Sequence, residues 1–357
     1  MNYKLLILCL IALAYGCQDN TVVTIQGEQF YINGSPAYEG VSWNGISMEG
    51  LLMNSRMVQG IFDDLNPETR NDFKYPDTGV WDPDRNTREF VEAMPSWKDH
   101  GLLAFTLNLQ GGSPVGYGNK ACINSTFDPE GELRPQYIER LKMILDEAED
   151  LGMVVILGYF YFRQDQHLKD EKAVLNAVDN ITTWILENNY RNVIVEINNE
   201  CNILYDHPIL QPERVHELME RVKGIEIKGH RLLVSTSYGG GTLPKPNVVK
   251  SSDFILLHGN GMHDPSTIPV LVESTRNVDG YQPKPIVFNE DDHYDFDRES
   301  NNMIEAIKSY ASWGYFDYRR DGEPFEDGFQ TVPADWKISS ERKKSFFNKL
   351  REITGNQ

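Results

Sequence analysis

The chain of 357 residues is long enough to bury a large core and is within reach of one α/β barrel with insertions. Hydrophobic residues make up 40%, charged residues 24% and aromatic residues 11%, a globular composition that excludes long disordered or fibrous segments. The 53 acidic and 34 basic residues give a net charge of -19, which repels a phosphate backbone, so we expect no nucleic-acid partner.

Residues 1–16 have the pattern of an export signal. Lys4 supplies the basic start, Leu5 to Leu13 form an apolar run too short to span a bilayer, and Ala14 to Gly16 form a small-residue cleavage site. Ordinary signal cleavage and a bacterial lipobox with a lipid on Cys17 both fit, and we favour the lipid. We therefore expect an exported protein, periplasmic or at the cell surface, whose only membrane contact is through Cys17.

Two other cysteines, Cys122 and Cys201, remain in the folded body. A disulfide between them and a pair of partly buried thiols are both open, and we favour the thiols because two cysteines make no framework.

Residues 17–36 are predicted to form a linker and a short β lead-in. Val22 to Asn33 alternates around Gly27, which indicates an N-terminal β-hairpin. Residues 37–357 are predicted to form the main domain.

In that domain, apolar runs of strand length alternate with amphipathic helical stretches, the order of βα units. The strand candidates are Tyr38 to Trp43, Leu102 to Leu109, Val154 to Phe162, Val193 to Asn199, Leu232 to Ser237, Phe254 to His258, Pro285 to Asn289 and Tyr315 to Tyr318. The clearest helices are Pro135 to Leu151 and Glu213 to Ile227, and the weakest is Asn247 to Ser252. Eight such units predict the α/β class and a (β/α)8 TIM barrel. Gly45 to Arg85 is interpreted as the first βα loop or a lid.

In a TIM barrel the active site lies at the carboxyl ends of the strands. The fourth predicted strand ends in Asn199-Glu200 and the seventh is followed by Glu290. Strands four and seven lie across the barrel mouth, so Glu200 and Glu290 are predicted to face one another. Two opposed carboxyl groups about 5–5.5 Å apart are the catalytic pair of retaining glycoside hydrolysis. Glu196 is expected to be a structural, hydrogen-bonded carboxylate inside the barrel.

These motifs resemble clan A of the glycoside hydrolases, the cellulase-like barrel enzymes. The resemblance implies that Glu200 is the acid/base, that Glu290 is the nucleophile and that Asn199 holds the sugar 2-hydroxyl. The resemblance in architecture covers the whole mature chain, whereas the resemblance in residues is limited to short motifs. The clan usually has an Arg at the end of strand two, where this chain has Asn108, and often a Tyr near strand six, where it has His258 and Asn260.

Four further residues are candidates for substrate binding: Trp43 after strand one, Asn108 after strand two, Tyr161 after strand three and His258 after strand six. Tryptophan and tyrosine offer flat faces to sugars, and histidine can bond a hydroxyl group. Asp291-Asp292-His293 matches no zinc pattern, so we expect neither a catalytic metal nor a cofactor.

The sequence thus predicts a retaining glycoside hydrolase acting on an oligo- or polysaccharide. The alternative is a surface lipoprotein that binds glycans without cleaving them. The sequence does not identify the sugar, the linkage or the oligomeric state.

Overall fold

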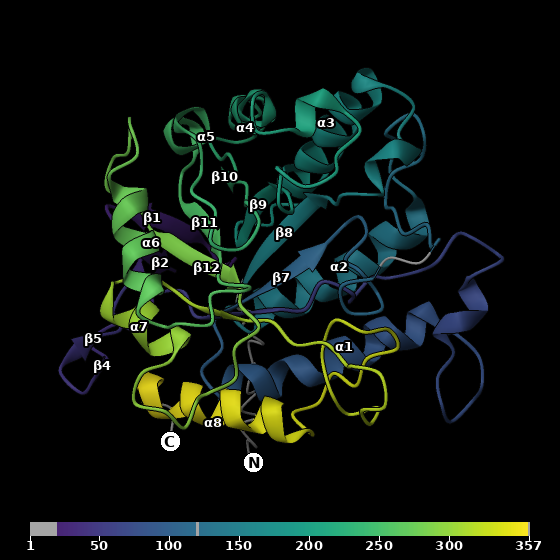
Figure 1. Cartoon of the computed structure of the whole chain (residues 1–357). Coiled ribbons are helices and arrows are strands. Elements are labelled where there is room, and N and C mark those ends of the chain that lie inside the picture. The colour runs from purple at the N-terminus through teal and green to yellow at the C-terminus, as the bar shows by residue number, and fades with distance from the viewer. Residues whose placement is uncertain (1–19, 119–120, 356–357) are drawn as a thin grey trace, which may run out of the picture.

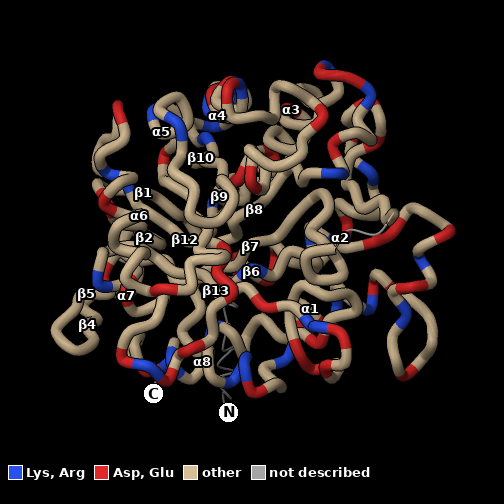
Figure 2. The backbone as a smooth tube through the Cα atoms, in the orientation of Figure 1, with Lys and Arg blue, Asp and Glu red and all other residues tan. Residues whose placement is uncertain are grey.

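The computed structural model describes residues 20–118 and 121–355 (Figure 1). The predicted export signal and Cys17 lie outside these residues, so the signal and the lipid stay predictions. Within the described residues, no helix has both the length and the apolar character needed to cross a bilayer. Acidic residues are spread over the outer helices and loops and are interspersed with Lys and Arg (Figure 2).

Eight parallel strands in the described part of the chain form the centre of the fold. They are β6 (Asn54–Arg56), β7 (Ala104–Asn108), β8 (Val154–Phe160), β9 (Val193–Asn198), β10 (Leu233–Ser235), β11 (Ile255–His258), β12 (Ile286–Glu290) and β13 (Gly314–Tyr315). Six of them pair in the order β10-β9-β8-β7-β6-β13, and β11 pairs with β12.

The ring closes through contacts at the two remaining joints. Phe288 of β12 donates its N–H to the carbonyl of Ser312 beside β13, at 2.9 Å. On the other side, Asp253 before β11 donates its N–H to the carbonyl of Val234 in β10, at 3.0 Å, and its carboxylate accepts the Val234 N–H. The predicted (β/α)8 barrel is therefore confirmed.

A helix follows each strand and packs on the outside of the ring (Figure 1). The helices are α1 (Pro83–Asp99), α2 (Pro135–Asp150), α3 (Glu171–Glu187), α4 (Val215–Gly224), α5 (Pro246–Ser251), α6 (Thr267–Arg276), α7 (Asn302–Lys308) and α8 (Glu341–Thr354), with short 3-10 turns η1 (Arg70–Phe73), η2 (Asp165–His167) and η3 (Pro208–Leu210). In α2, Pro135 is the first helical residue, and one face of the helix is buried, namely Tyr137, Leu141, Ile144, Leu145 and Ala148.

The predicted N-terminal hairpin is present as β1 (Val23–Gln26) and β2 (Gln29–Ile32), joined at Gly27. A third strand, β3 (Ser35–Pro36), pairs antiparallel with β2. Phe30 of this small sheet is fully buried and packs edge-on against Phe254, at the start of the sixth barrel unit. Its cluster includes residues from the amino ends of several strands, so the sheet seals the foot of the barrel, opposite the predicted site.

The first predicted strand, Tyr38 to Trp43, is wrong. Tyr38 and Gly40 have positive φ values of 52° and 69°, which no extended strand contains. The segment ends instead in a small antiparallel ladder, β4 (Ser42–Trp43) with β5 (Ile46–Ser47). The first barrel strand is β6, which lies inside the stretch from Gly45 to Arg85 that the sequence assigned to a loop.

Replacing Phe30 by Ala is expected to lower the free energy of unfolding by about 3–5 kcal/mol, because it leaves a cavity where the sheet seals the barrel. Urea denaturation measures the change, with Tyr31→Ala as the control, since Tyr31 is partly exposed in the same strand. Equal losses in the two variants would contradict the assigned role of Phe30.

Candidate active site

Glu200 and Glu290 meet at the carboxyl end of the barrel. Glu290 is the last residue of β12, and Glu200 follows β9 by two positions. One carboxylate oxygen of each residue and one ring nitrogen of His258 all lie within 4.8 Å of one another. Glu290 is buried, whereas the side chain of Glu200 is 16% exposed. The structure therefore brings together the carboxyl pair that the sequence placed across the barrel mouth.

Arg56 holds one side of this pair in place. Its Nε lies 2.7 Å from Oε2 of Glu290, and its Nη2 donates to Oδ1 of Asn199 at 2.7 Å. Because Arg56 is 1% exposed, its charge is little screened by solvent. The sequence analysis missed Arg56 because it assigned the first strand to other residues. The apolar run Leu51 to Met53, followed closely by Arg56, was the pattern that could have indicated a strand with a functional residue at its end.

His258 lies between the two carboxylates at the end of β11. Its Nδ1 is 2.9 Å from Oε1 of Glu200 and 3.7 Å from Oε2 of Glu290. Its Nε2 faces Oε1 of Glu196 at 4.0 Å, and Glu196 also lies 3.8 Å from Nη1 of Arg56. Glu196 is fully buried and accepts a hydrogen bond from Asn289, as expected for a carboxylate inside the barrel.

The three titratable groups at the mouth influence one another's pKa. Burial raises the pKa of Glu290, against the opposing charges of Arg56 and His258. Burial acts in the same direction on Glu200, but the hydrogen bond and charge of His258, with the charge of Arg56, outweigh it and lower the pKa of Glu200. For His258, burial favours the neutral ring, yet Glu290 and Glu200 together raise its pKa. Both shifts favour the ion pair, in which the proton between His258 and Glu200 lies on the imidazole.

Glu200 has a strained backbone, with a φ of 51° in the left-handed region that non-glycine residues seldom adopt. Its N–H donates to Oγ of Ser237 at 2.9 Å, and the next residue, Cys201, donates its N–H to the Ser237 carbonyl at 2.9 Å. Such strain costs on the order of 1–3 kcal/mol and persists where the surroundings impose it. The β10 end therefore aims the Glu200 side chain into the mouth.

Two predicted substrate ligands, Asn108 and Tyr161, are buried beside the mouth. Asn108 pairs in register with Gly158, which pairs with Glu196, so it lies in the barrel layer below Glu200. The hydroxyl group of Tyr161 is bonded to Oγ of Ser113 at 2.7 Å. Burial raises the pKa of the Tyr161 phenol, and the charges of Glu290 and Glu200 act in the same direction, so Tyr161 lies near both carboxylates. The assignment of Asn108 and Tyr161 as sugar ligands stays a prediction.

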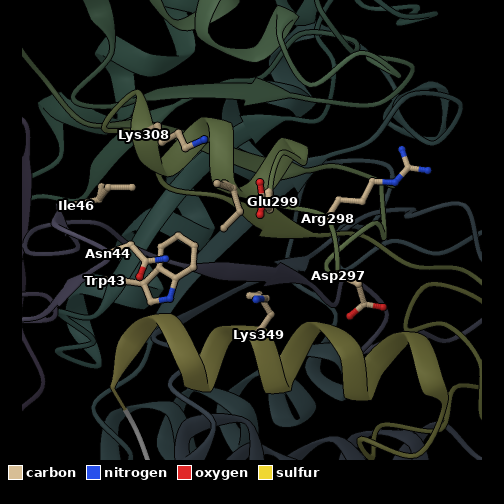
Figure 3. A pocket seen from close by; sticks show the side chains of 9 residues that line it. Trp43, Asn44, Ile46, Asp297, Arg298, Glu299, Lys308 and Lys349 are labelled. Atoms are coloured by element: carbon tan, nitrogen blue, oxygen red, sulfur yellow. The ribbon is translucent and has the colours of Figure 1, made fainter.

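Trp43 lies outside the active site, because it belongs to the β4–β5 ladder and not to a barrel strand. Its indole N–H donates to Glu352 of α8 at 3.0 Å. With residues of α7, α8 and the loop before α7, Trp43 lines a surface groove of about 430 Å³ (Figure 3). None of these elements carries Glu200 or Glu290, so the basis for predicting Trp43 as a sugar ligand is removed.

Asn260 is a second site residue that the sequence analysis did not select. Its side-chain amide donates to Oε1 of Glu290 at 2.8 Å. It follows His258 by two residues, so its position after a strand end was the available signal.

Among the residues that the structure describes, two groups of side chains have the composition of a cation site, namely Glu200, His258 and Glu290, and the run from Asp291 to His293. In the first group the guanidinium of Arg56 already supplies positive charge 2.7 Å from Glu290. In the second, Asp291 is bonded to Trp313, Asn302 and His293. These partners give both groups a role without an ion, and we assign no metal.

Cys122 and Cys201 are both buried, and no disulfide joins them. The expectation of two buried thiols is therefore confirmed.

No protein-family model matches the sequence, and no curated protein matches it significantly. Among solved structures, the chain resembles a Rhizomucor miehei endo-1,4-β-mannanase, with a TM-score of 0.58 and 13% identity, covering 94% of this chain and 100% of that one. It also resembles a glycoside hydrolase of family 5 from Bacteroides vulgatus, with a TM-score of 0.56 and 15% identity, covering 90% and 68% respectively.

A second Bacteroides vulgatus structure, provisionally named as a glycoside hydrolase, matches with a TM-score of 0.59 and 13% identity over 95% of this chain. This chain spans only 62% of the length of that protein. At these identities the likeness establishes the shared fold alone, the (β/α)8 barrel.

Arg56→Met is expected to destabilise the protein by about 3–5 kcal/mol near neutral pH, because it leaves buried carboxylates without their cation. In the variant, the folded-state pKa of Glu290, which burial already raises, is expected to rise further because the opposing charge of Arg56 is gone. The loss is therefore largest above that pKa and shrinks as acid protonates the carboxylates.

Thermal unfolding at about pH 5 and about pH 8 measures this dependence. Arg56→Lys, which keeps the charge, is the control and is expected to show the weaker pH dependence. A deficit in Arg56→Met that does not change with pH would contradict the electrostatic role.

Proposed function

We propose that the protein is a retaining glycoside hydrolase, with Glu290 as the nucleophile and Glu200 as the acid/base. The observation that carries this proposal is the approach of their carboxylate oxygens to within 4.8 Å, which fits the close spacing of retaining enzymes. The barrel, shared with family 5 glycoside hydrolases, supports it.

In the first step, a carboxylate oxygen of Glu290 attacks the anomeric carbon while the glycosidic C–O bond breaks. The electron pair of that bond goes to the leaving oxygen, which takes a proton from Glu200. In the second step, Glu200 accepts a proton from water, the water oxygen attacks the anomeric carbon, and the bond to Glu290 is released. Two displacements at one carbon retain its configuration.

His258 and Arg56 give the two carboxyl groups different protonation. Burial raises the pKa of Glu290, and Arg56, in direct contact with its carboxylate, opposes that rise and so favours the ionised form that a nucleophile requires. His258 supplies its proton to Glu200 across their 2.9 Å hydrogen bond when the sugar displaces water, because a drier site favours the neutral pair. Glu200 then enters the reaction as an acid although its pKa is lowered in the free protein.

Asn199 precedes Glu200, and its Oδ1 accepts a hydrogen bond from Arg56. Because Oδ1 of Asn199 is bonded to Arg56, its amide N–H groups are the donors that it can offer, and we propose that they bind a hydroxyl group of the sugar next to the scissile bond.

We propose an oligo- or polysaccharide as the substrate, acted on outside the cytoplasm by a protein tethered through a lipid on Cys17. The alternative, a lipoprotein that binds glycans without cleaving them, is less well supported. Glycan binding does not require two glutamates that share an imidazole.

Glu290→Gln is expected to lower kcat by at least about 10³-fold, because the amide cannot form the covalent intermediate. Glu200→Gln is expected to lose activity on glycosides with poor leaving groups but keep the first step on aryl glycosides with good ones. Mass spectrometry of Glu200→Gln after an activated substrate should then show a sugar attached to Glu290. Wild-type turnover by Glu290→Gln on an accepted glycoside would overturn the assignment.

The pH profile of kcat/KM is expected to be bell-shaped. Its acid limb lies above the usual range of a glutamate because burial raises the pKa of Glu290, and its alkaline limb lies above that of an ordinary histidine because the carboxylates raise the pKa of His258. Glu196→Gln removes a negative charge 4.0 Å from His258 and should move the alkaline limb to lower pH. An unmoved limb would contradict the coupling.

A further inference from the structure

Tyr117 is a large exposed side chain beside the catalytic carboxylates. It lies in the loop between β7 and α2, and 55% of its surface is accessible. Its ring packs edge-on against Phe316 and Tyr318, which follow β13. Its hydroxyl group donates to Oδ2 of Asp292 at 2.8 Å and accepts from the amide of Asn260, also at 2.8 Å. The two ring contacts and the two hydrogen bonds therefore hold the Tyr117 side chain in place, although more than half of its surface remains accessible.

Asn260 links this tyrosine to Glu290. Its Nδ2 donates one hydrogen to the Tyr117 hydroxyl and the other to Oε1 of Glu290, each at 2.8 Å. The backbone of Asn260 is fixed by close contact with Gly240, where an added Cβ would lie 2.1 Å from the Asn260 carbonyl oxygen. The fold thus sets the position of the Asn260 backbone, and the hydrogen bonds to Tyr117 and Glu290 orient its side-chain amide.

The two oxygens of Glu290 are consequently held from opposite sides. Arg56 contacts Oε2 and Asn260 contacts Oε1, so the rotation of the carboxylate is restrained at both atoms. Only the Asn260 side of this restraint leads to a residue on the open surface. A molecule that packs on Tyr117 can therefore affect how Glu290 is oriented.

We propose that Tyr117 is a specificity-determining residue whose ring packs against the sugar next to the scissile bond, and that Asn260, acting through its bond to Tyr117, is a positioning residue for Glu290. An aromatic ring with a polar edge suits the apolar C–H face of a pyranose. The loop between β7 and α2 would then select the substrate and orient the nucleophile together. The inference rests on the proposed function, since it assumes that Glu290 attacks a sugar.

Three variants separate the ring, the hydroxyl group and the amide. Tyr117→Phe keeps the ring, and we expect kcat to fall on the order of tenfold with KM within about twofold, because Asn260 loses its anchor. Asn260→Ala should lower kcat at least as much. Tyr117→Ala should lower kcat as Tyr117→Phe does and also raise KM on the order of tenfold, because the packing surface is lost.

The double variant Tyr117→Phe/Asn260→Ala tests the link. Because the hydroxyl group is proposed to act through Asn260, the double variant should be no slower than Asn260→Ala alone. Multiplying losses would overturn the positioning role, and equal KM values for Tyr117→Phe and Tyr117→Ala would overturn the sugar contact. Tyr31→Phe, which removes a hydroxyl group bonded to Gln29 at the far end of the barrel, is the control and should match the wild type.

Calorimetric titration of an oligosaccharide into Glu290→Gln, with and without Tyr117→Ala, measures the packing contact without turnover. Weaker binding with Tyr117→Ala supports the contact, and equal binding overturns it. Failure of the proposed function gives a different result, namely full activity in Glu290→Gln whatever the Tyr117 variants do.

Discussion

The ion pair between Arg56 and Glu290 is the constraint on which the mouth of this barrel depends. It joins the first strand to the seventh, so it forms only when the ring of strands is closed. Arg56 is also within reach of Glu196 and bonded to Asn199, and this one guanidinium offsets carboxylates that would otherwise be costly to bury. Fold and chemistry are therefore coupled, because the closure that completes the barrel also completes the charge balance of the site.

That balance gives two similar carboxyl groups different surroundings, as their proposed roles require. Glu290 has a cation and an amide on its two oxygens, whereas Glu200 is bonded to an imidazole that can give or take a proton. The strained backbone at Glu200 holds its carboxylate against His258. The difference in chemistry follows from the neighbours that each strand end contributes, rather than from the residue type.

The sequence predicted much of the barrel and the central pair, because the strands before Glu200 and Glu290 are apolar runs with a polar end. It did not predict β6, whose residues Asn54 to Arg56 are all polar. Asn54 and Arg56 contact residues far away in the chain, such as Phe288 and Glu290, and no local pattern reports such contacts. Because β6 was not recognised, the first barrel strand was assigned to Tyr38 to Trp43, and this wrongly placed Trp43 at the end of a barrel strand. Asn260 and Tyr117 come from separate loops, and only the fold shows that they meet.

The sheet at the foot of the barrel has a consequence for how the molecule is made. Phe30 is synthesised early, yet it packs on Phe254, which leaves the ribosome only after most of the chain. The seal must therefore wait for the later βα units, and the growing polypeptide keeps an unsatisfied apolar segment near its start throughout translation.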